Sequence, residues 1–212
     1  MTSQNELPVL TALETRVLGC LIEKKELTPD TYPLTLNATH AAANQKTARD
    51  PVMALELVEV RRALGLLEQK GLVRQAFAAR VERYEHSMAQ RFSLTSPQIA
   101  LLGLLMLRGP QTGFELLARS ERMARFGSID DLKSELDLLI GRNPPLVQQL
   151  DRAPGQREER YVHLLSGAVA VDAAPAYRAA PSPVAGSDLE ERVRVLEQEV
   201  AELRAMVQAL TA

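Results

Sequence analysis

The chain contains an internal repeat, which constrains its fold more than any other feature. The segment LTALETRVLGCLIEK, residues 10–24, recurs at an offset of 84 residues as LTSPQIALLGLLMLR, residues 94–108. Further along, VRRALGLLEQKGLV (60–73) returns as LKSELDLLIGRNPPLV (132–147). An opening helix and a closing helix-into-strand element therefore appear twice in the same order. Two copies of one small domain are predicted.

The order of elements within a copy predicts the fold class. Each copy is helical until a final pair of strand-like runs, which is typical of a winged helix-turn-helix domain, whereas a solenoid would need at least about three short repeats. A length of 212 residues suits one or two domains. We predict a mainly α fold with small β wings, in which two tandem winged helix-turn-helix domains at residues 1–92 and 93–170, each with its own core, precede a C-terminal coiled-coil helix.

Both copies open with the signature of a capped helix. Thr11 and Glu14 fit a capping box, and Thr95 and Gln98 repeat it, so side chains can satisfy the first backbone N–H groups. Each opening helix is expected to bury one apolar stripe. Cys20 lies within the first of these stripes, where a buried small hydrophobe is its expected role. As the single cysteine of the chain, it excludes an intrachain disulfide.

Turn residues and apolar spacing place the other elements. An extended turn is expected at Tyr32-Pro33, before the second helix. In the first copy we predict a second helix within 34–46 that ends near Asn44, a third helix after Asp50-Pro51 that ends at Gly71, and strands at 72–77 and 88–94 around a wing that carries Arg80, Arg83 and Tyr84. In the second copy we predict helices at 109–120 and 128–141, and strands at 146–150 and 160–165 around a Pro154-Gly155 turn.

The last part of the chain is predicted to be a linker followed by a dimerisation helix. Residues 171–187 are rich in proline, alanine and glycine, with almost no charge. Residues 188–212 then place valine at each a position of a heptad and leucine at each d position, a pattern that favours a parallel two-stranded coiled coil and hence a homodimer. Docking of this amphipathic helix on its own domain is the alternative. The seam consists of Leu189, Val193, Leu196, Val200, Leu203, Val207 and Leu210.

Hydropathy and charge narrow the function classes. The chain has no apolar run long enough to span a bilayer and no secretory leader, so a cytoplasmic protein without membrane contact is expected. Residues 1–92 carry 12 basic and 11 acidic residues, residues 93–170 carry 9 of each, and residues 171–212 carry 4 and 7. None of these balances is the strongly basic footprint of a typical nucleic-acid binder.

Four motifs in the same order indicate a family. They are TPDTYPLTLNATHAAANQKTARDPVM (28–53), RVERYEH (80–86), RGPQTGFEL (108–116) and PGQREERYVHL (154–164). With these motifs, residues 10–167 resemble the YceH-like family of uncharacterised bacterial proteins. The resemblance implies a tandem winged-helix fold and brings no activity with it. This chain departs from the family pattern at Ala43, where similar sequences usually have a cysteine, so no thiol or metal role is assigned there.

No residue pattern predicts catalysis or a metal site. The histidines His40, His86 and His163 lie in different elements, and no spacing of His, Cys and Asp suits a metal ion. No Ser/His/Asp order, glycine-rich phosphate loop or HExxH motif is present. We therefore expect a protein that is not an enzyme and uses no cofactor, unless residues distant in sequence assemble a site in space.

Basic residues of the first copy are the candidate DNA contacts. In a winged helix-turn-helix domain the recognition helix, which is the third helix of each predicted copy, enters the major groove, the turn before it lies against the DNA backbone, and wing residues contact phosphate or the minor groove. Asn44 is expected to cap the second helix, whereas Lys46 and Arg49 are left open between phosphate contact and fixing the turn. The candidates are Lys46, Arg49, Arg61, Arg62, Arg80 and Arg83.

Acidic residues weigh against DNA binding in parts of the chain. Glu56 and Glu59 share the third helix with Arg61 and would repel phosphate. In the corresponding helix of the second copy, acidic residues outnumber basic ones, with Asp130, Asp131, Glu135 and Asp137 against Lys133 and Arg142. We predict a DNA-associated regulatory protein that uses its first domain. The rival hypothesis is a dimeric adaptor whose winged helices bind protein.

Overall fold

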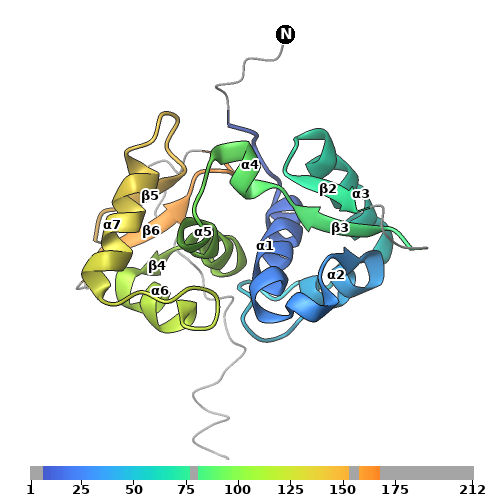
Figure 1. The fold of residues 1–212 in the computed structure, drawn as a ribbon, viewed down its shortest axis with the longest axis horizontal. Coiled ribbons are helices and arrows are strands. Elements are labelled where there is room, and N and C mark those ends of the chain that lie inside the picture. Colours follow the sequence, from blue (N-terminus) through green and yellow to red (C-terminus); the bar gives the residue numbers. More distant parts are fainter. Residues whose placement is uncertain (1–6, 77–80, 153–157, 168–212) are drawn as a thin grey trace, which may run out of the picture. The chain divides into compact units, whose positions relative to one another are not determined.

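The computed structural model describes residues 7–76, 81–152 and 158–167, which form helices and short antiparallel strands (Figure 1). The first copy contains α1 (Ala12–Leu27), the 3-10 helix η1 (Pro29–Thr31), β1 (Leu34–Thr35), α2 (Leu36–Ala43), α3 (Leu57–Gln69), β2 (Val73–Ala76) and β3 (Arg83–His86). After α4 (Met88–Phe92), the second copy contains α5 (Ser96–Arg108), β4 (Gln111–Thr112), α6 (Gly113–Ser120), α7 (Ile129–Ile140), β5 (Val147–Leu150) and β6 (Arg160–His163). A mainly helical chain with small sheets is confirmed.

The two copies have the same sheet topology. Each sheet is antiparallel and three-stranded, with the strand order β1-β3-β2 in the first copy and β4-β6-β5 in the second. Tyr84 pairs with Leu34, and Tyr161 pairs with Gln111 at the corresponding position. The central strands also share a sequence, since Arg-Tyr-x-His occupies both 83–86 and 160–163. The repeat therefore extends to the register of the strands.

The predicted capping boxes are confirmed at the start of both opening helices. The Thr11 hydroxyl accepts the N–H of Glu14 at 3.2 Å, and the Glu14 carboxylate accepts the N–H of Thr11 at 2.8 Å. Thr95 and Gln98 make the same exchange at the start of α5. Sequence alone could place these helix starts because a capping box uses only residues three apart.

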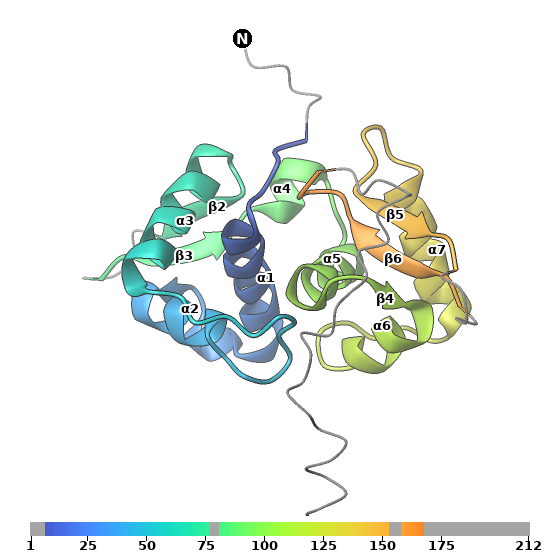
Figure 2. The ribbon, with the colours of Figure 1, turned by 180° about the vertical axis from the view of Figure 1, so that it is seen from behind.

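The opening helices α1 and α5 lie side by side between the two copies (Figures 1 and 2). We expected one buried stripe on each, but all residues of 14–23 and of 98–107 are buried. The prediction was too narrow because each helix packs against its own copy on one side and against the other copy on the other side. The apolar side chains form one continuous cluster through both copies, in place of the separate cores that we expected.

A pair of repeated glycines lies where α1 and α5 meet. A Cβ atom on Gly103 would come within 2.6 Å of Cγ2 of Ile22, and a Cβ atom on Gly19 would come within 3.0 Å of the Leu107 side chain. Real Cβ atoms do not approach other heavy atoms as closely as the first of these distances. The absence of a side chain at both positions thus lets the two helices approach each other closely.

One predicted strand was wrong. Residues 88–94 contain helix α4, and the strand that pairs with β2 is β3, so Arg83 and Tyr84 belong to this strand and not to the wing. The register with β2 ends at His86, where the Ser87 N–H donates to the carbonyl of Leu72. Met88 is then fully buried on α4, and Ser93 ends that helix in the left-handed conformation. In a segment this short, the spacing of apolar residues is compatible with a helix and with a strand, so periodicity did not distinguish the two structures.

The short strands β1 and β4 were not predicted. Each contains only two residues and leads directly into a helix, so we assigned β4 to a longer predicted helix over 109–120. That helix begins at Gly113, because the Thr112 side chain accepts the N–H of Glu115 and caps it. In the first copy Asn44 is the C-cap of α2, as expected, and in the second copy Ser128 caps α7.

Two buried histidines predict a dependence of stability on pH. His86 and His163 hold corresponding positions in β3 and β6, and burial lowers the pKa of each to about 4, with a further contribution from Lys25 at His86. An unfolded histidine has a pKa of about 6.5, so between this pH and about 4 the unfolded state binds more protons than the folded state. The free energy of unfolding should therefore decrease as the pH falls through this window, by up to about 1.4 kcal/mol per pH unit for each histidine.

Urea unfolding at pH 7 and pH 4.5 measures this effect. The variant His86→Phe/His163→Phe removes both titrating groups and should lose less stability between the two pH values than the wild-type protein. An equal loss in both proteins would show that other groups, such as the carboxylates, account for the acid sensitivity.

Candidate nucleic-acid interface

The side of α3 that points away from the core carries the strongest candidate surface. Val60, Ala63, Leu64 and Leu67 are buried along one side of the helix. A helix has 3.6 residues per turn, so residues 58, 61, 62 and 65 lie on the opposite side. We call Val58, Arg61, Arg62 and Gly65 the outward face of α3. Val58 is 70% exposed, both arginines are exposed, and Gly65 is half-exposed.

The two arginines of the outward face are available to an external anion. Among the described residues, no ion pair or hydrogen bond engages the guanidinium group of Arg61 or Arg62. Glu59, which we expected to repel phosphate, accepts the N–H of Glu56 at 2.8 Å. Its carboxylate is therefore held at the start of the helix. Glu82 directly precedes β3, and its carboxylate accepts a hydrogen bond from the hydroxyl of Tyr84 at 3.1 Å.

Arg49 is not a DNA contact, which corrects one of our six candidates. Its side chain is buried, and its guanidinium donates to both carboxylate oxygens of Glu23, at 2.9 and 2.5 Å. The remaining donors bind the carbonyl oxygens of Ala42 and Ala48 and the side-chain oxygen of Gln45. Burial alone would lower the pKa of Arg49, but the hydrogen bonds to Glu23 raise it above its ordinary value.

The loop between α2 and α3 is held by further side chains of the same motif. Asn44 accepts the N–H of Leu55 at 2.7 Å and donates to its carbonyl at 2.9 Å, and His40 also contacts that carbonyl at 2.8 Å. Arg16 of α1 is buried and donates to the carbonyl of Pro51 at 2.6 Å. The side chains of His40, Asn44 and Arg16 therefore hold the loop between α2 and α3 in place. Asn44 makes these contacts in addition to its expected role as the C-cap of α2.

The other candidates have different surroundings. Lys46 is exposed in the loop after α2. Arg83 is half-buried and donates to the carbonyl of Pro33 at 2.7 Å, which ties β3 to the segment before β1. Arg80 lies outside the described residues, as do the seven residues of the predicted coiled-coil seam. The structure thus brings Arg61 and Arg62 together on one face and assigns Arg83 a contact within the fold.

Val58 and Gly65 were missed as members of this surface. The alignment of 60–73 with 132–147 identifies their counterparts in the second copy, where Asp130, Lys133, Ser134 and Asp137 stand in place of Val58, Arg61, Arg62 and Gly65. The signal in the sequence was the helical spacing of residues 58 and 65 from the two arginines. All four counterparts on α7 are exposed, so the outward surfaces of the two copies differ in charge although their folds correspond.

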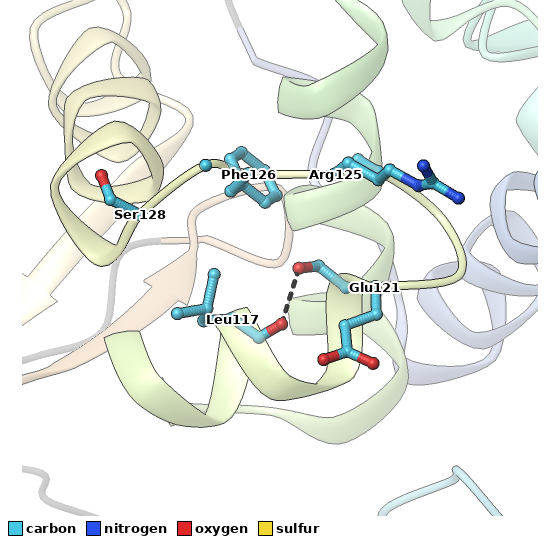
Figure 3. Close-up of a pocket in the computed structure, with 8 residues that line it drawn as sticks. Leu117, Glu121, Arg125, Phe126 and Ser128 are labelled. Atoms are coloured by element: carbon cyan, nitrogen blue, oxygen red, sulfur yellow. Dashed lines mark hydrogen bonds between the residues drawn. The ribbon is translucent and has the colours of Figure 1, made fainter.

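A pocket of about 480 Å³ lies between the end of α6 and the start of α7 (Figure 3). Figure 3 shows Arg125 and Ser128 on opposite sides of it, and the Ser120 hydroxyl donates to the carbonyl of Leu117 at 2.9 Å. Ser120 is thus engaged by the helix itself. Glu121 and Arg125 are exposed and form no ion pair with each other. The lining residues bring no nucleophile and base together, so the pocket does not support a catalytic proposal.

Other chemistry within the described residues is limited. No group of three or more His, Cys, Asp or Glu side chains in 7–76, 81–152 and 158–167 could hold a metal ion. Cys20 is buried, as expected, and burial raises the pKa of its thiol to about 11, which disfavours a reactive thiolate. No helix in this part of the chain is long and apolar enough to cross a membrane.

Comparisons with known proteins identify relatives across the whole chain. The sequence model of the family described as "Protein of unknown function, DUF480" matches residues 10–156. A UPF0502 protein of Mesorhizobium japonicum is 73% identical over 205 residues, which cover 97% of this chain and 98% of the relative. UPF0502 proteins of Xanthomonas campestris and Stenotrophomonas maltophilia are 55% and 50% identical, covering 100% and 97% of this chain and 97% and 95% of their own lengths.

Proposed function

The chain belongs to the DUF480 family of bacterial proteins. From the geometry of the first copy we propose that it is a DNA-binding regulatory protein that contacts duplex DNA through the outward face of α3. Each copy has the element order helix, strand, helix, helix, strand, strand. This order supports a winged helix-turn-helix fold for both copies, the architecture that the YceH-like resemblance implies, with α3 as the helix that enters the major groove.

The difference between the outward faces of the two copies carries the proposal. In the first copy the four positions of this face carry two arginines and no acidic residue, and the exposed Glu68 lies two turns beyond Arg61, whereas in the second copy aspartate occupies two of the four positions. Cationic side chains on such a helix bind phosphate and the acceptor atoms of guanine, and carboxylates are repelled by both. The same fold therefore offers one surface suited to DNA and one that is not.

The C-terminal heptads complete the proposal, although they lie outside the described residues. A parallel coiled coil over 188–212 would join two chains into a homodimer. Two copies of α3 could then occupy successive major grooves, so the preferred DNA site should be a pseudo-palindrome with half-sites about ten base pairs apart or a multiple of this spacing. Light scattering at tens of micromolar protein tests the dimer, and a monomer would contradict it.

Titration of a mixed-sequence duplex with the full chain tests DNA binding. At about 50 mM salt the wild-type protein should bind, since nonspecific affinities of roughly 10⁻⁴ to 10⁻⁶ M persist even at physiological salt. The variant Arg61→Ala/Arg62→Ala should bind more weakly and lower the log-log slope of affinity against salt by about 1.8, because each lost phosphate contact removes about 0.9.

Lys133→Ala provides the matched control, because Lys133 is the counterpart of Arg61 on α7. It should leave both the affinity and the slope unchanged. Conversely, Asp130→Lys/Asp137→Lys should strengthen nonspecific binding by removing two repulsive charges. If the wild-type protein does not bind at high micromolar concentration, the DNA proposal fails and the adaptor proposal takes its place.

The adaptor proposal has an observation of its own. Leu138 on α7 is 60% exposed and Phe114 on α6 is 57% exposed, in the copy whose third helix is acidic. Exposed apolar side chains beside an acidic helix suit contact with protein more than contact with DNA. Under this proposal Leu138→Ser should weaken binding of a protein partner, whereas Arg61→Ala/Arg62→Ala should not.

A further inference from the structure

No contact inside the molecule explains why residue 65 is a glycine. It lies in the middle of α3, where glycine is less favourable than alanine by a factor of about five in the helix equilibrium. Its backbone is not among those with positive φ, and a Cβ atom built there would meet no heavy atom within 4 Å. Gly19 and Gly103, in contrast, would place a Cβ atom against side chains of the other copy. The missing side chain of Gly65 therefore leaves space on the surface.

Gly65 also lies at the centre of the outward face. Successive residues of a helix are about 100° apart, which places residue 65 between residues 61 and 62 in projection and close to the direction of residue 58. Arg61 and Arg62 thus flank a strip in which Val58 is the exposed apolar residue and Gly65 is the empty position. A partner that reaches the arginines comes close to the backbone at Gly65.

We propose that this strip determines sequence preference in duplex DNA: Gly65 lets the backbone of α3 approach the base edges of the major groove, and Val58 contacts the methyl group of a thymine. The inference rests on the proposed function and adds the residues that distinguish one site from another. Arginine donates to O6 and N7 of guanine, and apolar side chains contact the C5-methyl group of thymine. A preferred half-site should therefore contain guanine and thymine close together.

The second copy shows that the fold does not require this strip. Asp130 and Asp137, the counterparts of Val58 and Gly65, are both exposed on α7, which packs within its copy as α3 does. A valine and a glycine at these positions are thus a property of the first copy alone. Complementarity of charge assigns the partner, because the four positions of this strip carry two unpaired guanidinium groups and no carboxylate, with Glu68 two turns beyond Arg61, and such a strip suits a polyanion.

The test begins with selection of a preferred site from a random duplex library by the full-length protein at about 50 mM salt. Affinity is then compared between the selected site and the same site with deoxyuridine in place of each thymine in turn, since uracil lacks only the methyl group. The wild-type protein should lose about fourfold in affinity at one position of the half-site, the effect expected for one methyl contact. Val58→Ala should bind the two versions of that position equally.

Gly65→Leu tests the close approach separately. It should weaken binding to the selected site by about tenfold or more, the scale of losing one good base contact, and should weaken binding to mixed-sequence duplex by a smaller factor, so that the preference for the selected site falls. Unfolding by urea should show that the variant is folded. Ser134→Leu places the same side chain at an exposed, uncharged position of α7 and should alter neither affinity.

The outcomes separate this inference from the proposed function. Failure of the wild-type protein to bind any duplex would overturn both. Binding of mixed-sequence duplex without a preferred site, or a preferred site at which deoxyuridine and Gly65→Leu have no effect, would overturn the inference alone. In that case DNA binding would rest on phosphate contacts by the arginines.

Discussion

Replacement of Arg49 by methionine is expected to lower the free energy of unfolding by about 3 to 5 kcal/mol, the loss typical when one partner of a buried ion pair is removed. The Arg49 side chain is fully buried and that of Glu23 is 8% exposed. The variant removes the two close hydrogen bonds to the buried Glu23 carboxylate and leaves it, among the described residues, only the longer ion pair with Lys24, at 3.7 Å. It also removes the donors that bind the carbonyl groups of Ala42 and Ala48. Urea unfolding measures the loss.

Arg74→Met is the matched control for this prediction. Arg74 forms an ion pair with Glu85 at 2.7 Å, but its side chain is 61% exposed, and exposed pairs contribute about 0 to 1 kcal/mol. The double variant Glu23→Leu/Arg49→Met should recover part of the lost stability, because no charge then remains buried without a partner. A loss at Arg49 no larger than the loss at Arg74 would contradict the structural role assigned to the buried pair.

Gly103→Ala is expected to destabilise the protein, whereas Gly65→Ala should stabilise it. Both substitutions place alanine within a helix, where it is favoured over glycine by about 1 kcal/mol. At position 103 the new methyl group would come within 2.6 Å of Ile22, and crowding of a packed core costs about 1 to 3 kcal/mol, which outweighs the gain. At position 65 there is no neighbour within 4 Å, so the gain remains.

Thermal unfolding of the two variants and the wild-type protein decides this comparison, since the midpoints should lie on opposite sides of the wild-type value. Stabilisation by Gly103→Ala would show that α1 and α5 are farther apart than described here. That result would also leave the repeated glycines without an explanation in the packing of the two copies.

The repeat and the local residue patterns could be interpreted without the structure. The repeat predicted two similar copies, and the capping boxes at Thr11 and Thr95 placed the starts of α1 and α5. Helical spacing identified the buried side of α3 and therefore the outward position of Arg61 and Arg62. The capping boxes and the helical spacing extend over only a few residues, and the repeat needs only an alignment of the chain with itself, so none of these signals requires knowledge of tertiary contacts.

Local pattern did not separate short elements from their neighbours. Residues 88–94 satisfied the pattern of a strand, but β3 had already completed the sheet at His86 and the chain formed α4. Similarly, the two-residue strand β4 was included in a predicted helix. Which of two local structures such a segment adopts depends on the strand available to pair with it, and this partner comes from elsewhere in the chain.

Which polar and apolar residues face solvent where the copies meet depends on contacts between segments that are distant in the chain. Arg49 looked available to phosphate in the sequence, but Glu23 lies 26 positions before it, and nothing in their spacing indicates that α1 and the loop after α2 bring them to 2.5 Å. The same packing buries α1 and α5 on all sides and makes Gly19 and Gly103 necessary at their contact. Burial is a property of the assembled copies, because a helix acquires its second buried face only when another segment covers it.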